Sequence, residues 1–72
     1  TTYDLIFADP PYDFEISLFS KIPELVFKND LLNDEGLLII EHSKHTDLSD
    51  LDYFSELKTY GGNCFSFFQK TD

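Results

Sequence analysis

The stretch that decides the fold is DLIFADPPYD, residues 4–13, where an apolar run meets an acid, two prolines and a tyrosine. Residues Tyr3 to Ala8 are short, mostly apolar and ended by the proline pair, which is typical of a strand covered on both faces of a parallel sheet. In open α/β sheets, ligands bind beyond the carboxyl ends of such strands. We therefore expect the Asp9-Pro10-Pro11-Tyr12 segment to lie at a functional edge of the sheet.

A helix and a second strand are expected to follow. Residues Glu15 to Asn29 carry apolar side chains at spacings of three and four, which favours a helix. Pro23 lies inside this segment and predicts a kink or two short helices, because proline removes a hydrogen bond and clashes one turn back. Asn33 to Gly36 has turn chemistry, and Leu37 to Ile40 is a second apolar run. The pattern predicts a right-handed strand–helix–strand unit with parallel strands.

The C-terminal third is expected to form a hairpin. Tyr53 to Tyr60 and Asn63 to Lys70 are two strand-like runs joined by Gly61-Gly62, and glycines accept the positive φ angles of a tight turn. We expect the last run to lie antiparallel beside Leu37 to Ile40, with Tyr53 to Tyr60 outside it. The sequence thus predicts an α/β domain in three layers, with two parallel strands and an antiparallel pair.

The segment from His42 to Asp52 is polar and acidic, with Thr46 or Asp47 as the cap of a single helical turn. Its two histidines and Cys64 resemble a metal site only superficially, since zinc needs three or four ligands at firm spacing. We expect a polar loop here and no metal site. A minor role of His42 near a substrate is left open, outside the catalytic set.

Composition and charge bound the function. The 72 residues carry a formal net charge of −9, so a nucleic-acid target would need a basic surface supplied from elsewhere. The lone Cys64 cannot form an internal disulfide, and no apolar run approaches the roughly 20 residues of a membrane span, so we expect a cytoplasmic protein. The chain has no Met and opens directly on a strand, which we interpret as the start of a fragment.

The Asp9-Pro10-Pro11-Tyr12 loop is suited to hold an amino group. Its prolines have fixed φ and no N–H, so the Asp9 carboxylate and the Pro10 carbonyl are rigid acceptors without competing donors. An exocyclic amine or side-chain amide has two N–H donors and a delocalised lone pair. Two fixed acceptors would hold both hydrogens and leave the lone pair directed at an incoming methyl group.

Asp9 is also a candidate proton acceptor, and Tyr12 a stacking partner for a base, a contact worth about 1–3 kcal/mol in nucleic-acid proteins. A base in a duplex would first have to be flipped out. The competing interpretation is a stiff structural turn. An acid, two prolines and an aromatic residue at the end of an apolar strand are rare enough by chance to favour the catalytic interpretation.

These residues resemble a known family. DLIFADPPYD is similar to motif IV, Asp/Asn-Pro-Pro-aromatic, of S-adenosylmethionine-dependent methyltransferases that modify exocyclic amino groups. GLLIIEHSK (36–44) and KTYGGNCFSFFQK (58–70) resemble a strand and the closing hairpin of the RsmD family, which methylates a guanine N2 of small-subunit ribosomal RNA. Its members are sometimes labelled N6-adenine-specific DNA methylases.

The resemblance implies a class I (Rossmann-like) methyltransferase fold, of which residues 1–72 would be the C-terminal portion. It implies catalytic roles for Asp9, Pro10, Pro11 and Tyr12, and it places Ala8 and Asp9 at part of the S-adenosyl-L-methionine pocket. The glycine-rich motif that cradles this cosubstrate is missing, since no G-x-G occurs. We therefore expect the chain alone to bind S-adenosyl-L-methionine weakly and to be inactive, with ribosomal RNA or the small ribosomal subunit as the partner of the longer protein.

Two alternatives stay open. The same loop serves adenine-N6 DNA and glutamine-N5 protein methyltransferases, although many of these have Asn where this chain has Asp9. The other alternative is a non-catalytic interaction domain. Its main feature would be the unpaired edge of Tyr3 to Ala8, which we expect to promote self-association.

Overall fold

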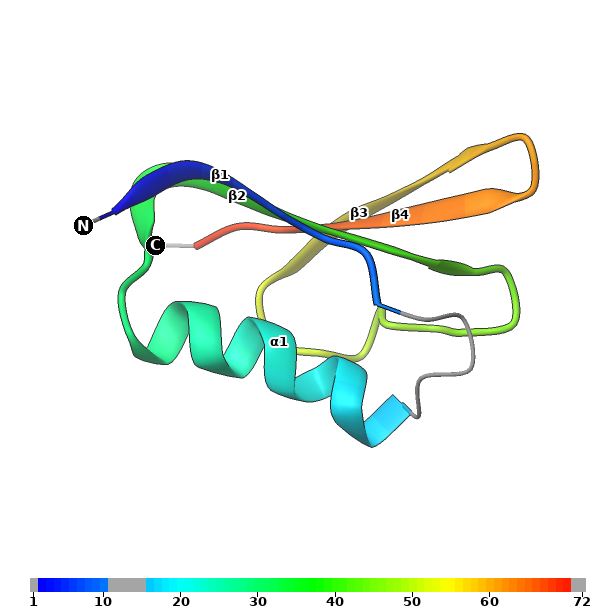
Figure 1. Ribbon diagram of the computed structural model, residues 1–72, viewed down its shortest axis with the longest axis horizontal. Coiled ribbons are helices and arrows are strands. Elements are labelled where there is room, and N and C mark those ends of the chain that lie inside the picture. Colours follow the sequence, from blue (N-terminus) through cyan, green and yellow to red (C-terminus); the bar gives the residue numbers. More distant parts are fainter. Residues whose placement is uncertain (1, 11–15, 71–72) are drawn as a thin grey trace.

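The computed structural model describes residues 2–10 and 16–70, which form one four-stranded sheet and one helix (Figure 1). The elements are, in chain order, β1 (Tyr3–Ala8), α1 (Ile16–Lys28), β2 (Leu32–Ser43), β3 (Phe54–Tyr60) and β4 (Asn63–Phe68). The strand order is β1-β2-β4-β3, with β1 parallel to β2 and β4 antiparallel to both of its neighbours. The predicted order, with the last strand beside the second and the third strand outside, is confirmed.

Helix α1 covers one face of this sheet, and the segment between β2 and β3 runs on the same side (Figure 1). The opposite face has no helix among the described residues, so the described part has two layers, and the predicted third layer is wrong for it. Strand β1 was expected to be covered on both faces, which is also wrong. Tyr3, Leu5 and Phe7 are 50–57% exposed, because they point away from α1.

Helix α1 continues through Pro23 instead of dividing into two helices. Phe19, Pro23, Val26 and Phe27 are all buried and recur on the inner face of the helix. If the helix ended at the proline, apolar side chains beyond that point would be exposed. Keeping them buried offsets the cost of about 3 kcal/mol for an internal proline. Among the described residues, no helix is long and apolar enough to cross a bilayer.

Strand β2 is longer than the predicted Leu37 to Ile40 and begins at Leu32. The turn predicted at Asn33 to Gly36 is wrong, because these residues form an irregularity inside the strand. The pairs Tyr3↔Leu32 and Leu5↔Leu37 enclose more residues of β2 than of β1, so the extra residues bulge out of the ladder. Residues that favour turns are also those that accommodate a bulge.

Gly36 is required at this bulge. A Cβ atom there would lie 3.0 Å from a methyl group of Leu32 and 3.1 Å from the backbone carbonyl oxygens of Asn33 and Tyr3. The close approach fixes where the regular parallel register begins, which then runs from Leu5↔Leu37 to Ala8↔Ile40. The position of the end of β1 relative to β2 depends on this contact.

The hydrophobic core lies between α1 and the sheet. It consists of Phe19, Val26, Phe27, Leu32, Leu38, Ile40, Leu48 and Phe68. In β4 the buried Cys64, Ser66 and Phe68 alternate with half-buried residues, so one face of the strand points into the core. The hairpin turn is confirmed at Gly61-Gly62, although only Gly61 has a positive φ, of 61°.

Candidate active site

The candidate site lies at the edge of the sheet where β1 and β2 end. Ala8 is paired with Ile40, and β2 continues to Ser43, whose partner is Asn63 at the start of β4. The end of β1, the end of β2 and the tip of the β3–β4 hairpin therefore lie at one edge (Figure 1). The parallel strands direct their carboxyl ends here, as expected for a ligand-binding edge.

The predicted catalytic loop begins at this edge. Asp9 follows β1 directly and is exposed, while Ala8 and Pro10 are half-buried. Asp9 is thus accessible to solvent at the end of a parallel strand, and its role as an acceptor stays a prediction. Pro11 and Tyr12, the other two predicted catalytic residues, lie outside the described residues, and their roles stay predictions.

His42 is the main residue that sequence reasoning missed at this edge. It was expected in a polar loop, but it belongs to β2 and is 1% exposed. Its Nε2 lies 2.7 Å from the Ser66 hydroxyl and its Nδ1 2.9 Å from the backbone carbonyl oxygen of Ser43. The signal was available in the spacing, since His42 continues the alternation of Leu38 and Ile40 on the buried face of the strand.

Aromatic side chains cover the opposite face of the sheet near the same edge. The rings of Phe7 and Tyr60 lie 6.5 and 5.8 Å from the ring of Phe65, which is between them. Lys58 places its ammonium group 5.3 Å from the centre of the Phe67 ring. Phe7 and Tyr60 are 54% and 62% exposed, so this face offers aromatic and cationic groups to whatever covers it.

Among the described residues, three groups have shifted pKa values: Asp30 and Lys70 lie away from this edge, whereas Asp47 lies in the segment that follows the end of β2. Lys70 donates a hydrogen bond of 2.8 Å to Asp30, which lowers the pKa of the Asp30 carboxyl and raises the pKa of the Lys70 ammonium group. The Ser49 hydroxyl and backbone N–H both donate to Asp47, which lowers the pKa of that carboxyl. Asp47, one of the two residues predicted to be a cap, thus caps the short turn before β3.

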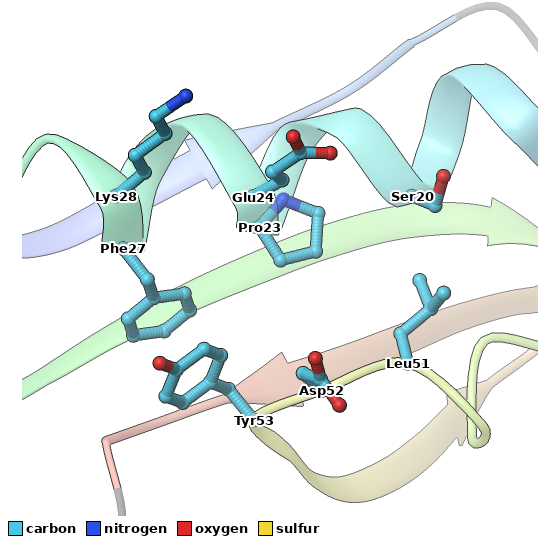
Figure 2. A pocket seen from close by; sticks show the side chains of 8 residues that line it. All are labelled: Ser20, Pro23, Glu24, Phe27, Lys28, Leu51, Asp52 and Tyr53. Atoms are coloured by element: carbon cyan, nitrogen blue, oxygen red, sulfur yellow. The ribbon is translucent and has the colours of Figure 1, made fainter.

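A groove with a volume of about 390 Å³ lies along α1, away from Asp9 (Figure 2). Its wall is made by the stacked rings of Phe27 and Tyr53, whose centres are 4.1 Å apart. Tyr53 adopts a left-handed backbone conformation with φ 71°, unusual for a bulky residue. The remaining lining residues are Ser20, Pro23, Glu24, Lys28, Leu51 and Asp52. Within residues 2–10 and 16–70, no group of three or more potential metal ligands occurs.

Comparison with known proteins identifies the family. The family model described as conserved hypothetical protein 95 matches residues 1–69. The chain belongs to this family. The predicted recognition of an RsmD-type methyltransferase family is confirmed, as is the predicted fold class, since the solved relatives share the arrangement of strands and helix.

Some relatives of the chain are named methylases. The chain is 42% identical over 62 residues to an uncharacterized methylase of Rickettsia prowazekii. The match covers 82% of the chain and 25% of that protein. The structure of a candidate methylase from Haemophilus influenzae matches 97% of the chain with a TM-score of 0.71 and 25% identity. A conserved hypothetical protein of Streptococcus pyogenes matches 96% with a TM-score of 0.75 and 23% identity.

The chain spans only part of these proteins, namely 44% of each of the two solved structures. The relatives therefore hold more structure than the elements described above. The Rickettsia protein is named a methylase and the Haemophilus protein a candidate one. These names make methyl transfer the chemistry to consider for the exposed Asp9 at the end of β1.

Proposed function

We propose that the protein containing this chain transfers a methyl group from S-adenosyl-L-methionine to an exocyclic amino group, with guanine N2 of small-subunit ribosomal RNA as the target. The observation that carries the proposal is the exposed Asp9 followed by Pro10 at the carboxyl end of a parallel strand, in a family whose relatives are named methylases. The loop sequence supports methyl transfer to an amino group directly. It gives less support to the choice of guanine N2 as the group that is methylated.

The chemistry requires a nucleophilic amine in a fixed orientation. The Asp9 carboxylate and the Pro10 carbonyl accept the two amine hydrogens, so that the nitrogen lone pair points at the methyl group. A nitrogen–carbon bond forms while the sulfur–carbon bond of the sulfonium breaks, and the electron pair remains on sulfur. The surplus proton of the amine then passes to Asp9 or to solvent. Orientation and electrostatic stabilisation account for most of the rate.

Only part of the methyl donor's site is on this chain. Ala8 is half-buried and paired with Ile40, and it directly precedes the exposed Asp9. These two residues fit one side of a donor held at the strand ends. No glycine-rich strand-to-helix turn is present to hold the rest of the donor, so residues outside this sequence must supply it.

The target is proposed from the resemblance of residues 36–44 and of the closing hairpin, residues 58–70, to the RsmD family. A net charge of −9 opposes binding to any polyanion, so the longer protein must carry its own basic surface if RNA is the substrate. The adenine-N6 and glutamine-N5 alternatives use the same loop and the same acceptors. They differ in the base or amide that Tyr12 would contact, and product analysis separates them.

The exposed features of β1 support a proposal about partners. Tyr3, Leu5 and Phe7 are half-exposed, and β1 is an edge strand of the described sheet. We propose that residues 1–72 are the C-terminal portion of one methyltransferase domain, whose remaining part covers this edge. Without it, the chain is expected to associate through β1, because an apolar unpaired edge invites pairing with another chain.

The test is methyl transfer by the natural full-length protein with labelled S-adenosyl-L-methionine. Small ribosomal subunits, their RNA, duplex DNA and protein are offered separately, and Asp9→Ala is the control. The proposal expects label in ribosomal RNA, as N2-methylguanine, that disappears with Asp9→Ala. Label only in DNA or protein would overturn the target and keep the reaction. Label retained by Asp9→Ala would overturn the role of the loop.

A further inference from the structure

We propose that His42, hydrogen-bonded to Ser66, is a positioning residue that holds the start of α1, which follows the segment carrying Asp9, against the end of β2. The catalytic consequence of this proposal rests on the proposed function, whereas the positioning itself rests on the geometry. His42 is not proposed to touch substrate, since it is 1% exposed and lies on the face of the sheet covered by α1.

The first observation is that both anchors of the segment meet one short stretch of β2. At its start, Ala8 is paired with Ile40, two residues before His42. Beyond its end, the fully buried Phe19 near the start of α1 lies beside the imidazole in a T-shaped arrangement, with ring centres 6.2 Å apart and planes at 76°. A shift of the imidazole would therefore move the start of the helix relative to the end of β1.

The second observation is that hydrogen bonds at both nitrogens fix the orientation of this ring. A carbonyl oxygen only accepts, so the contact of Nδ1 with the Ser43 carbonyl places a proton on Nδ1. In the neutral ring, Nε2 is then an acceptor and takes the proton of the Ser66 hydroxyl at 2.7 Å. The ring cannot rotate by 180° without losing both bonds, and none of the buried side-chain polar atoms in the described residues lacks a partner.

The third observation is where this polar pair lies. Ser66 is also 1% exposed and belongs to β4, so the bond joins the end of β2 to the neighbouring strand inside an otherwise apolar layer. An apolar pair would fill this space without the cost of burying polar groups. What the bond adds is a single ring orientation, and the ring it orients is the one that contacts Phe19. Specificity of position is the property that a catalytic loop needs, because a misplacement of about 1 Å can reduce a rate about 100-fold.

Ser66→Ala removes the hydroxyl that bonds His42, while His42, Asp9 and the loop keep their sequence. Ser66→Thr keeps the hydroxyl and is the conservative variant. Leu38→Val is the matched control, because Leu38 is fully buried on the same face of β2 but four residues before His42. All are made in the natural full-length protein, and kcat and KM are measured well below the unfolding temperature of each variant.

We expect Ser66→Ala to lower kcat about 10- to 100-fold with little change in the KM for S-adenosyl-L-methionine. Ser66→Thr should restore most of kcat, and Leu38→Val should lose stability without losing kcat. An equal loss of kcat in Ser66→Ala and Leu38→Val at matched stability would reduce His42 to ordinary packing and overturn the proposal. An unchanged kcat in Ser66→Ala would also overturn it.

Two NMR measurements need no activity. In the wild-type protein, long-range ¹H–¹⁵N correlations should show the His42 proton on Nδ1, and a neutral ring protonated on Nε2 would overturn the proposal. In Ser66→Ala, the backbone amide signals of Asp9 and Ser17 to Ser20 should shift, while that of Asn29, beyond the far end of α1, stays in place. If these shifts occur but the wild type methylates no substrate, the proposed function fails and the positioning role stands. If they do not occur, the positioning role fails whatever the activity.

Discussion

Substitution of the three glycines by alanine separates close packing from backbone conformation. Gly36 has the crowded environment at the β1–β2 bulge, Gly61 has a positive φ of 61° in open space, and Gly62 has neither constraint. The three sites thus differ in one physical property at a time. Gly36→Ala is the informative variant, because the bulge sets the register that carries Asp9 to the edge of the sheet.

The cost of Gly36→Ala follows from the three contacts of 3.0–3.1 Å that its Cβ would make. Two of the three atoms are backbone carbonyl oxygens, of Asn33 and Tyr3, and they cannot turn aside as a side-chain end can. The third belongs to Leu32, which is 2% exposed and packed in the core. Relief requires these three atoms to give by a few tenths of an ångström within β2 and at Tyr3 of β1, so we expect a loss of about 1–3 kcal/mol in the free energy of unfolding, as for other overpacked sites.

The free energies of unfolding are measured by urea denaturation of the natural full-length protein. Gly61→Ala should cost about 1–2 kcal/mol for its left-handed conformation, and Gly62→Ala should stay within about 0.5 kcal/mol of the wild type. Gly36→Ala should also lower methyl transfer more than its stability loss explains, because the end of β1 moves. A Gly36→Ala variant as stable and active as Gly62→Ala would refute the reasoning about the bulge.

Further outcomes are expected elsewhere in the molecule. Phe68→Ala should cost about 3–5 kcal/mol in urea denaturation, because the ring is fully buried against Phe54, and a loss below about 1 kcal/mol would contradict the core described above. Lys70→Gln should raise the pKa of the Asp30 carboxyl toward its ordinary value, as read by NMR titration. Lys70 lowers the pKa of the Asp30 carboxyl in the folded state. The ion pair therefore stabilises the fold at pH values above the ordinary pKa of a carboxyl group, and this stabilisation is lost as the pH falls through the lowered pKa. An unchanged Asp30 titration in the variant would argue against the ion pair. Residues 1–72 prepared alone should associate, and Phe7→Lys should weaken the association in light scattering, since Phe7 is 54% exposed on β1; a wild-type monomer would count against pairing through this strand.

The sequence predicted the elements that depend on local patterns. The Gly61-Gly62 turn and the two strand-like runs beside it specify a hairpin from neighbouring residues alone, and the hairpin is confirmed. The parallel pairing of β1 and β2 followed from two apolar runs separated by a helix. Even the position of β4 between β2 and β3 was predictable once the hairpin was accepted.

The errors have a common origin in contacts that the sequence does not display. Asn33 to Gly36 has turn composition, but the β1 backbone beside it converts the turn into a bulge within β2. Pro23 favours a break, yet its burial on the inner face of α1 keeps the helix whole. His42 looks like a loop residue because its partner, Ser66, is distant in sequence, and only the pairing of β2 with β4 brings the two together. The position of Asp9 at the end of a parallel strand was predictable from the motif, whereas the contact of His42 with Ser66 depends on strand pairing and was not.

The central claim is that Asp9 orients an amino group for methylation, and one measurement tests it most directly. The natural full-length protein and its Asp9→Ala variant are incubated with labelled S-adenosyl-L-methionine and small ribosomal subunits, and the RNA is digested to nucleosides. The account predicts labelled N2-methylguanosine with the wild type and a loss of at least about 100-fold with Asp9→Ala, measured at saturating S-adenosyl-L-methionine. Equal labelling by the two proteins would contradict the claim.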